Sequence, residues 1–254
     1  MKCVNCENDT LSVGQSKCKK CYDKERYLKI KNGNWEFNPT PPKILTDIQD
    51  KVLIGGLLGD FSLYQYKNQI NSGIAISRAI KDIEYLKYQF DLFKEFCPAG
   101  IKIRNTFDKR TNKTYTGCSF RTQVAEVFTP YKQKWYPEGI KIVPRDLKLT
   151  PLICAIWFCD DGSVVYTGSN KLGRRISLYT DSFLKEEVEF LQCLLKDTIN
   201  VSFMITRKNS MKDINRGFYL YLTKRDDVIT YINYIKNDIS YSMNRKSDRW
   251  KGWI

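Results

Sequence analysis

The 254-residue chain is long enough for one large domain or two smaller ones, and its formal net charge of +14 favours a polyanionic partner, most often nucleic acid, over a basic protein without that role. Histidine is absent, which excludes a Ser-His-Asp triad, a Cys-His nucleophile pair, an imidazole base and any histidine-ligated metal. No apolar run approaches the ~20 residues that cross a membrane, and the first residues lack the apolar region of a signal peptide, so we expect a soluble, intracellular protein with no membrane partner.

Residues 1–30 contain two CxxC pairs and are expected to form a small zinc module. Cys3 and Cys6 make the first pair, and Cys18 and Cys21 make the second. Each pair can place two thiolates on one tetrahedral ion, and four sulfurs complete a structural zinc site. So short a segment cannot bury enough surface to fold without the metal. Its lysines could contact nucleic-acid phosphates; a purely structural or protein-binding role is the alternative.

The chain has nine cysteines, an odd number that fits poorly with disulfides in an intracellular protein. The five cysteines outside the CxxC pairs occur singly among apolar residues, and we expect them to pack in the core. They are Cys97, Cys118, Cys154, Cys159 and Cys193.

Residues 31–46 are interpreted as a linker, because the adjacent prolines within 38–42 exclude a helix. A helix is predicted over 44–58, and its apolar run ends on Asp60. An acid at the end of a buried helix lies near the negative end of the helix dipole, so its desolvation is costly unless a cation meets it. Gly55 and Gly59 lie one turn apart and leave a bare strip for a second helix.

The pattern repeats in a second apolar run, 153–163, which contains Asp160 and Asp161. Asp161 follows Asp60 by 101 residues, and neighbouring patterns repeat at an offset of 105, which indicates a duplicated unit of about a hundred residues. The second predicted helix, 150–159, would cross the first and bring Asp60 and Asp161 together around a metal ion. Carboxylate ligands favour magnesium or manganese.

The two units, 47–140 and 141–254, each read helix, hairpin, helix, hairpin, helix, which predicts an α+β fold. Each antiparallel sheet would have one apolar face for the core and one polar, basic face suited to a DNA groove; an ordinary half-solvated sheet is the alternative. The predicted strand pairs are 63–66 with 73–77, 101–107 with 114–121, 163–166 with 175–180, and 201–207 with 217–223; further helices are 83–96, 184–196 and 228–235. The residues expected to bind DNA are Arg104, Arg121, Arg174, Arg175, Arg207 and Lys208.

Together, these features resemble the LAGLIDADG homing endonucleases in their single-chain form with two motifs. The motifs are LIGGLLGDF, in which Asp60 occupies the position of the first catalytic acid, and AIWFCDDG, in which Asp161 occupies the position of the second. The run LTPLICAIWFCDDG and the later TDSF and EEVEFL segments are similar to the mitochondrial omega-intron endonuclease in particular. The likeness covers about residues 47–250 and does not include the four-cysteine module.

The resemblance implies two pseudo-symmetric αββαββα units on a long, asymmetric DNA site. Asp60 and Asp161 would bind Mg²⁺ or Mn²⁺ and cut both strands, leaving short 3′ overhangs, with Asp160 as an outer carboxylate or a less favoured ligand. Lys141 and Lys246 fall at the positions of family lysines near the metals, where they would orient water or steady the developing charge.

The resemblance also leaves two other activities open. Some members act as maturases that help an intron RNA fold, and others are DNA-binding regulators that do not cleave. A regulator typically lacks an acid, and both are present, so we expect a site-specific double-strand DNA endonuclease. We further expect a monomer whose partners are double-stranded DNA and, as an open alternative, intron RNA. Its expected location is the cytoplasm of a bacterial or phage-infected cell, or else the mitochondrion.

Overall fold

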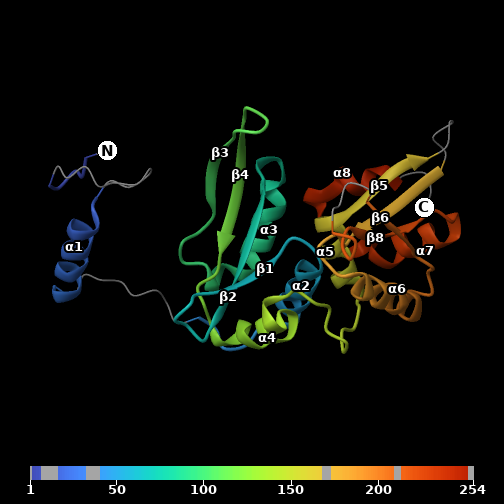
Figure 1. Cartoon of the computed structure of the whole chain (residues 1–254), viewed down its shortest axis with the longest axis horizontal. Helices are drawn as coiled ribbons and strands as arrows, with labels where there is room; N and C mark the ends of the chain where they lie inside the picture. Colours follow the sequence, from blue (N-terminus) through green and yellow to red (C-terminus); the bar gives the residue numbers. More distant parts are fainter. Residues whose placement is uncertain (1, 7–16, 33–40, 168–172, 209–212, 251–254) are drawn as a thin grey trace. The chain divides into compact units, whose positions relative to one another are not determined.

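A computed structural model describes residues 2–6, 17–32, 41–167, 173–208 and 213–250 (Figure 1). The chain divides into two compact units, Met1–Thr40 and Pro41–Ile254. Residues 33–40 of the predicted linker 31–46 lie outside the described residues, as do residues 168–172 and 209–212 between the predicted strand pairs of the second unit. None of the described helices combines the length and the apolar composition that a membrane crossing needs.

In its described residues, 2–6 and 17–32, the first unit contains the cysteine pairs and one helix, α1 (Lys19–Lys31). Cys18 directly precedes this helix and Cys21 lies in its first turn, so the second CxxC pair is held at the start of a helix. Lysines and exposed tyrosines are spread around α1 without an apolar stripe. Hydrophobic periodicity therefore does not reveal this helix in the sequence.

The first half of the larger unit begins with α2, which starts at Asp47 rather than at residue 44. Thr46 fixes the start of the helix as its N-cap residue. The Thr46 hydroxyl accepts the Gln49 N–H and the Gln49 side chain accepts the Thr46 N–H, which forms a reciprocal capping box. The elements of this half are α2 (Asp47–Leu58), β1 (Ser62–Gln65), β2 (Ser72–Ala79), α3 (Ile83–Phe93), β3 (Lys102–Asp108), β4 (Lys113–Arg121) and α4 (Thr129–Trp135).

The second half repeats this succession. Its elements are α5 (Pro151–Asp161), β5 (Gly162–Thr167), β6 (Gly173–Tyr179), α6 (Lys185–Ile199), β7 (Met204–Arg207), β8 (Phe218–Leu222) and α7 (Arg225–Ile235), followed by the short α8 (Asn244–Ser247). The strand β7 begins three residues later than predicted, because Val201 and Phe203 are buried in the connection that follows α6. Helix α5 also runs two residues further than predicted, to Asp161 itself.

Each half has one four-stranded antiparallel sheet, with the orders β1-β2-β4-β3 and β5-β6-β8-β7. The two orders are the same when β1 is matched to β5, which confirms the prediction of two αββαββα units (Figure 1). In both sheets one face carries buried side chains, such as Ile74, Ile76 and Phe120 in the first and Ile176, Leu178 and Leu220 in the second. The opposite face of each sheet, called the open face below, carries mostly polar side chains.

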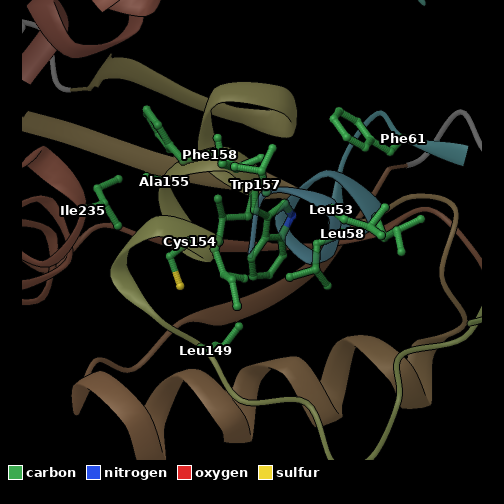
Figure 2. Packing of buried hydrophobic residues seen from close by; sticks show 14 of the residues in the cluster. Leu53, Leu58, Phe61, Leu149, Cys154, Ala155, Trp157, Phe158 and Ile235 are labelled. Atoms are coloured by element: carbon green, nitrogen blue, oxygen red, sulfur yellow. The ribbon is translucent and has the colours of Figure 1, made fainter. Parts of the chain in front are cut away.

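Helices α2 and α5 pack against each other and join the two halves. A Cβ atom added to Gly55 would lie 2.7 Å from the Ile153 carbonyl oxygen, and one added to Gly59 would lie 2.4 Å from the Asp160 Cβ. The bare strip predicted from the sequence is therefore the contact surface. Figure 2 shows the fully buried Trp157 pointing from α5 toward α2, where Leu53 and Leu58 lie in the same core.

Four of the five single cysteines are buried, as predicted: Cys97, Cys118, Cys154 and Cys159. The prediction for Cys193 is wrong, because its side chain is exposed on α6. Buried residues of this helix such as Val188, Leu191 and Leu195 recur every three or four positions, and Cys193 falls between them on the outer face.

Candidate active site and nucleic-acid surface

The predicted acids lie where α2 and α5 end beside each other. Asp60 is two residues beyond the end of α2, and Asp161 is the last residue of α5. The Asp160 side chain lies against Gly59 and accepts the backbone N–H of Asp60 at 3.2 Å. The missing side chain of Gly59 thus allows a carboxylate of one half to reach the backbone that carries the acid of the other half.

An arginine that lies outside both sequence motifs links Asp60 and Asp160. Arg78, at the end of β2, donates from Nη1 to Asp60 Oδ2 and from Nη2 to Asp160 Oδ1, each at 2.6 Å. The Asp160 side chain is fully buried, whereas that of Asp60 is 37% exposed. Burial raises the pKa of Asp160, and the charge of Arg78 opposes this. The sign of this role in the sequence is that Arg78 continues the alternation of the apolar Ile74 and Ile76 and so falls on the buried face of the strand.

Asp161 has an environment that favours a cation. Burial, followed by the negative charges of Asp60 and Asp160, raises its pKa to about 7, while Lys246 and Lys141 oppose the rise. Among the described residues, no cation lies within ion-pair distance of its carboxylate. A carboxylate that pays for desolvation beside other acids is relieved by a metal ion. Two acids from two helix ends suit magnesium, which takes one or two carboxylates and fills its octahedron with water and phosphate oxygens.

The predicted lysine Lys141 lies in the segment that connects the two halves. Burial lowers its pKa to about 8, and the carboxylates of Asp161, Asp160 and Asp60 act in the opposite direction. Its Nζ lies 5.2 Å from the centre of the Phe183 ring, and within the described part of the chain it has no hydrogen-bond partner. An ammonium held near the acids without a fixed partner is available to a water molecule or a phosphate.

Glu187 of α6 fixes the segment that carries Lys141. Its buried carboxylate accepts the Val143 N–H and the Arg145 guanidinium, each at 2.6 Å. Both donors belong to the connecting segment, two and four residues after Lys141. No spacing rule in the sequence indicates an anchor 46 residues after Lys141 on another helix.

Lys246, the second predicted lysine, has a different arrangement. Its ammonium donates to the carbonyl oxygens of Phe158, Cys159 and Asp160 at 3.1, 2.6 and 3.1 Å. These carbonyls belong to the last turn of α5, so Lys246 satisfies the end of that helix and compensates its dipole. Burial lowers its pKa. All three of its donors are therefore engaged, unlike those of Lys141.

In the smaller unit, Cys3, Cys6, Cys18 and Cys21 come together. Their sulfur atoms all lie within 4.8 Å of one another, and tetrahedral zinc with Zn–S distances of about 2.3 Å requires separations of about 3.8 Å. The Cys18 N–H donates to the Cys3 sulfur at 3.2 Å and lowers the pKa of Cys3 to about 6. The four thiols fit one zinc ion, and within the described ranges they are the one set of three or more such ligands close enough to share an ion.

The open face of the first sheet is basic. Arg104 on β3 pairs with Gly117, and Arg121 on β4 pairs with Ala75, which places both arginines on the face opposite Ile76 and Phe120. Both are exposed. Lys102 and Lys113 share this face. The side chains project where an anionic duplex could lie.

The open face of the second sheet is aromatic as well as basic. The Arg175 guanidinium donates to the Tyr219 hydroxyl at 2.9 Å and lies 4.1 Å from the Tyr221 ring centre. Lys208, just after β7, is paired with Asp181. Two other predicted residues, Arg174 and Arg207, are in phase with buried Ile176 and half-buried Ile205 and donate to backbone carbonyls. They therefore lie on the covered side of the sheet, toward its end.

Comparisons with known proteins agree with this geometry. A model described as the LAGLIDADG DNA endonuclease family matches residues 50–228. The chain is 27% identical over 183 residues to the cytochrome b mRNA maturase bI2 of Saccharomyces cerevisiae, covering 68% of this chain and 41% of that protein. It is 28% identical over 207 residues to the probable intron-encoded endonuclease 1 of Wickerhamomyces canadensis, covering 78% of this chain and 85% of that protein. The chain thus spans less than half the length of the yeast maturase.

A solved structure shares the fold over most of the chain. The homing endonuclease I-WcaI, bound to its DNA recognition sequence, superposes with a TM-score of 0.71 and 22% identity, covering 93% of this chain and 94% of that chain. The paired sheets and the two central helices are therefore an arrangement found in a known DNA complex.

Proposed function

The chain belongs to the LAGLIDADG DNA endonuclease family, and we propose that it is a site-specific endonuclease that cuts both strands of a long, asymmetric DNA target. The observation that carries this proposal is that Asp60 of the first half and Asp161 of the second half lie close to each other and to the buried ammonium of Lys141. The maturase and intron-encoded endonuclease among its relatives support a role tied to introns.

In the proposed mechanism, Asp60 and Asp161 hold Mg²⁺ or Mn²⁺ from opposite halves. When bound, the metal supplies an activated water and neutralises charge on the phosphate. Asp60 offers one oxygen, because the other is bonded to Arg78. Both oxygens of Asp160 are used by Arg78 and by the Asp60 N–H, which makes Asp160 a support for the site rather than a ligand.

The lysines have separate tasks in this mechanism. With a pKa near 8, Lys141 can donate a hydrogen bond to the phosphate in its charged form or accept a proton from water in its neutral form. Lys246 holds the end of α5, which carries Asp160 and Asp161, through three carbonyl oxygens. Arg104, Arg121, Arg175 and Lys208 would contact the duplex on the open faces, and Arg174 and Arg207 would contact it at the sheet end.

A plasmid that carries the intron-less junction of the DNA flanking the gene tests the proposal. We expect linear product with Mg²⁺ and none with EDTA. Undiminished cleavage in EDTA would exclude a metal held by Asp60 and Asp161.

The four cysteines are proposed to bind one structural zinc ion, because their sulfurs fit a tetrahedral site. Elemental analysis of the purified protein should give one zinc per chain, and a Cys18→Ala, Cys21→Ala variant should lose it. We expect this variant to bind DNA more weakly and to keep its cleavage chemistry. Full zinc retention in the variant would contradict the assignment.

A maturase activity is a second candidate, favoured by the match to cytochrome b mRNA maturases in two yeasts. Self-splicing of the host intron, measured with and without the protein, tests this role. Acceleration that survives Asp161→Asn would separate RNA binding from DNA cleavage, and an unchanged splicing rate would exclude the maturase role.

A further inference from the structure

Arg78 is a charged residue on the covered face of a strand. Ile74 and Ile76 precede it on the same face of β2 and are buried, and the Arg78 side chain is only 4% exposed. An arginine is rarely buried among apolar side chains unless a set of partners satisfies it. The partners of Arg78 are therefore informative about its role.

The guanidinium of Arg78 is satisfied on three sides. Its two terminal nitrogens bind Asp60 and Asp160, and its Nε donates to the Gln89 side-chain oxygen at 3.1 Å. The guanidinium carbon lies 4.6 Å from the centre of the Tyr85 ring. Gln89 and Tyr85 are fully buried residues of α3. Only a planar guanidinium can meet this set of acceptors at once, because a lysine ammonium is a point charge on a flexible stem.

This arrangement connects the two halves of the molecule. Asp60 follows α2 of the first half, and Asp160 belongs to α5 of the second half. Arg78 therefore compensates two acids that would otherwise repel each other across the junction of the halves. The Asp60 N–H bond to Asp160 closes the same ring of contacts.

The second half has no equivalent of Arg78. Ser62 pairs with Ala75 in the first sheet, and Ser163 pairs with Ser177 in the second, each serine lying two residues after its acid. Arg78 lies three residues after Ala75, and Thr180 lies at the equivalent position, three residues after Ser177. The Thr180 hydroxyl donates to the Phe218 carbonyl oxygen at 2.8 Å. The first motif is thus supported by a guanidinium bonded to the side chain of its acid, whereas Lys246 supports the second motif through backbone carbonyl oxygens of α5.

We propose that Arg78 is a positioning residue that fixes Asp60 against Asp160 before any metal binds, and that its presence in one half makes the protein cut the two DNA strands at unequal rates. The first part concerns the free protein. The second part rests on the proposed endonuclease function.

Thermal unfolding of the zinc-loaded protein without added Mg²⁺ tests the first part. Arg78→Gln leaves Asp160 buried without a cation, so we expect Tm to fall by roughly 10 °C. Adding Asp160→Asn removes the buried charge and should restore most of the loss. Lys134→Gln, which removes a positive charge from an exposed pair with Asp146, is the matched control and should leave Tm unchanged. An unchanged Tm in Arg78→Gln, or a double variant no more stable than the single, overturns the first part.

Strand-resolved cleavage tests the second part, with a duplex of the intron-less junction labelled separately on its two strands. In the Arg78→Gln, Asp160→Asn double variant, Asp60 has lost its anchor while the fold is kept. We expect the ratio of the two strand rates to change by about tenfold or more, because a small displacement of a reacting group is costly. Lys134→Gln should keep the wild-type ratio. Equal slowing of both strands would show a merely structural role and overturn this part; a wild-type protein that cuts neither strand refutes the endonuclease function, while the unfolding result still decides the first part.

Discussion

The two acids that close the repeated helices have different surroundings. Asp60 is 37% exposed and bonded through one oxygen to Arg78. Asp161 has no ion pair among the described residues, and burial together with the charges of Asp60 and Asp160 raises its pKa to about 7. A repeated motif thus gives one compensated and one uncompensated carboxylate. The difference arises because the neighbours that set the electrostatics come from strands and connections outside the motif.

The two lysines differ in the same way. Lys141 approaches the acids without a hydrogen-bond partner in the described part of the chain, whereas Lys246 is held by three carbonyl oxygens of α5. Lys141 and Lys246 occupy equivalent sequence positions, 105 residues apart, but of these two ammonium groups only that of Lys141 is left free by the described residues to bind another group. Function is divided between the halves even though the fold repeats.

The largest effect is expected from removing either acid. Asp60→Asn and Asp161→Asn keep size and hydrogen bonding but lose the charge that holds a metal, so double-strand cleavage should fall by about 10³-fold or more. DNA binding should survive, as measured by gel shift with Ca²⁺ in place of Mg²⁺. A wild-type cleavage rate in Asp161→Asn would mean that this carboxylate is structural and that the comparison of the two acids has no bearing on catalysis.

The lysines should separate next. Lys141→Met should reduce cleavage by roughly 10²–10⁴-fold, the range of a positioned proton-handling group. Lys246→Met should also reduce cleavage, because it releases the end of α5 that carries Asp161. Only Lys246→Met should also lower Tm, because it leaves three carbonyls at the end of α5 without a donor. The lowered pKa of Lys141 indicates that burial disfavours its charge, so methionine at this position should not reduce stability. Equal Tm losses in the two variants would contradict the division of roles.

A pH series distinguishes the acids by a smaller effect. The metal requires the ionised form of Asp161, whose pKa is raised to about 7, so the Mg²⁺ concentration for half-maximal cleavage should rise about tenfold for each pH unit below 7. In zinc-loaded protein without Mg²⁺, the effect of pH on stability has the opposite sign. The folded protein holds the Asp161 proton up to about pH 7 and the unfolded chain releases it near pH 4, so this group lowers Tm as pH rises from about 4 to 7. Asp161→Asn should remove that component, and an unchanged pH dependence of Tm would contradict it.

The smallest effect concerns the outer faces of the two sheets. A chain with a net charge of +14 should bind DNA with a strong salt dependence. Arg104→Gln, on the open face of the first sheet, should reduce the slope of log K against log salt by about 1. Arg174→Gln, on the covered side of the second sheet, should reduce it by less. Equal changes would show that the phosphate footprint is not limited to the open faces.

Much of this architecture follows from the local sequence. The repeat offset, the glycines of α2 and the alternation of the strands were sufficient to predict both halves, the helix pair and the two helix ends at which Asp60 and Asp161 lie. The start of α2 was missed because hydrophobic periodicity does not register the capping box of Thr46. Helix α1 has no apolar stripe, and Cys193 lies on the outer face of an amphipathic helix.

The site was less predictable than the fold, because its support comes from distant segments. Arg78 meets Asp160, 82 residues later, and Glu187 holds a segment 44 residues earlier. Neither contact has a characteristic spacing, since each depends on how complete units pack. The inward phase of Arg78 on β2 was the one local sign of its role.

The contact between Gly59 and Asp160 has a consequence for assembly. Asp160 occupies the space that Gly59 leaves bare, so the two residues are complementary in shape and differ in charge. If the second half paired with a copy of itself through the same surface, two buried carboxylates would face each other without a cation. If the first half did so, each Arg78 would lose its buried acceptor. The two halves are thus complementary at this contact, and neither half is complementary to a copy of itself.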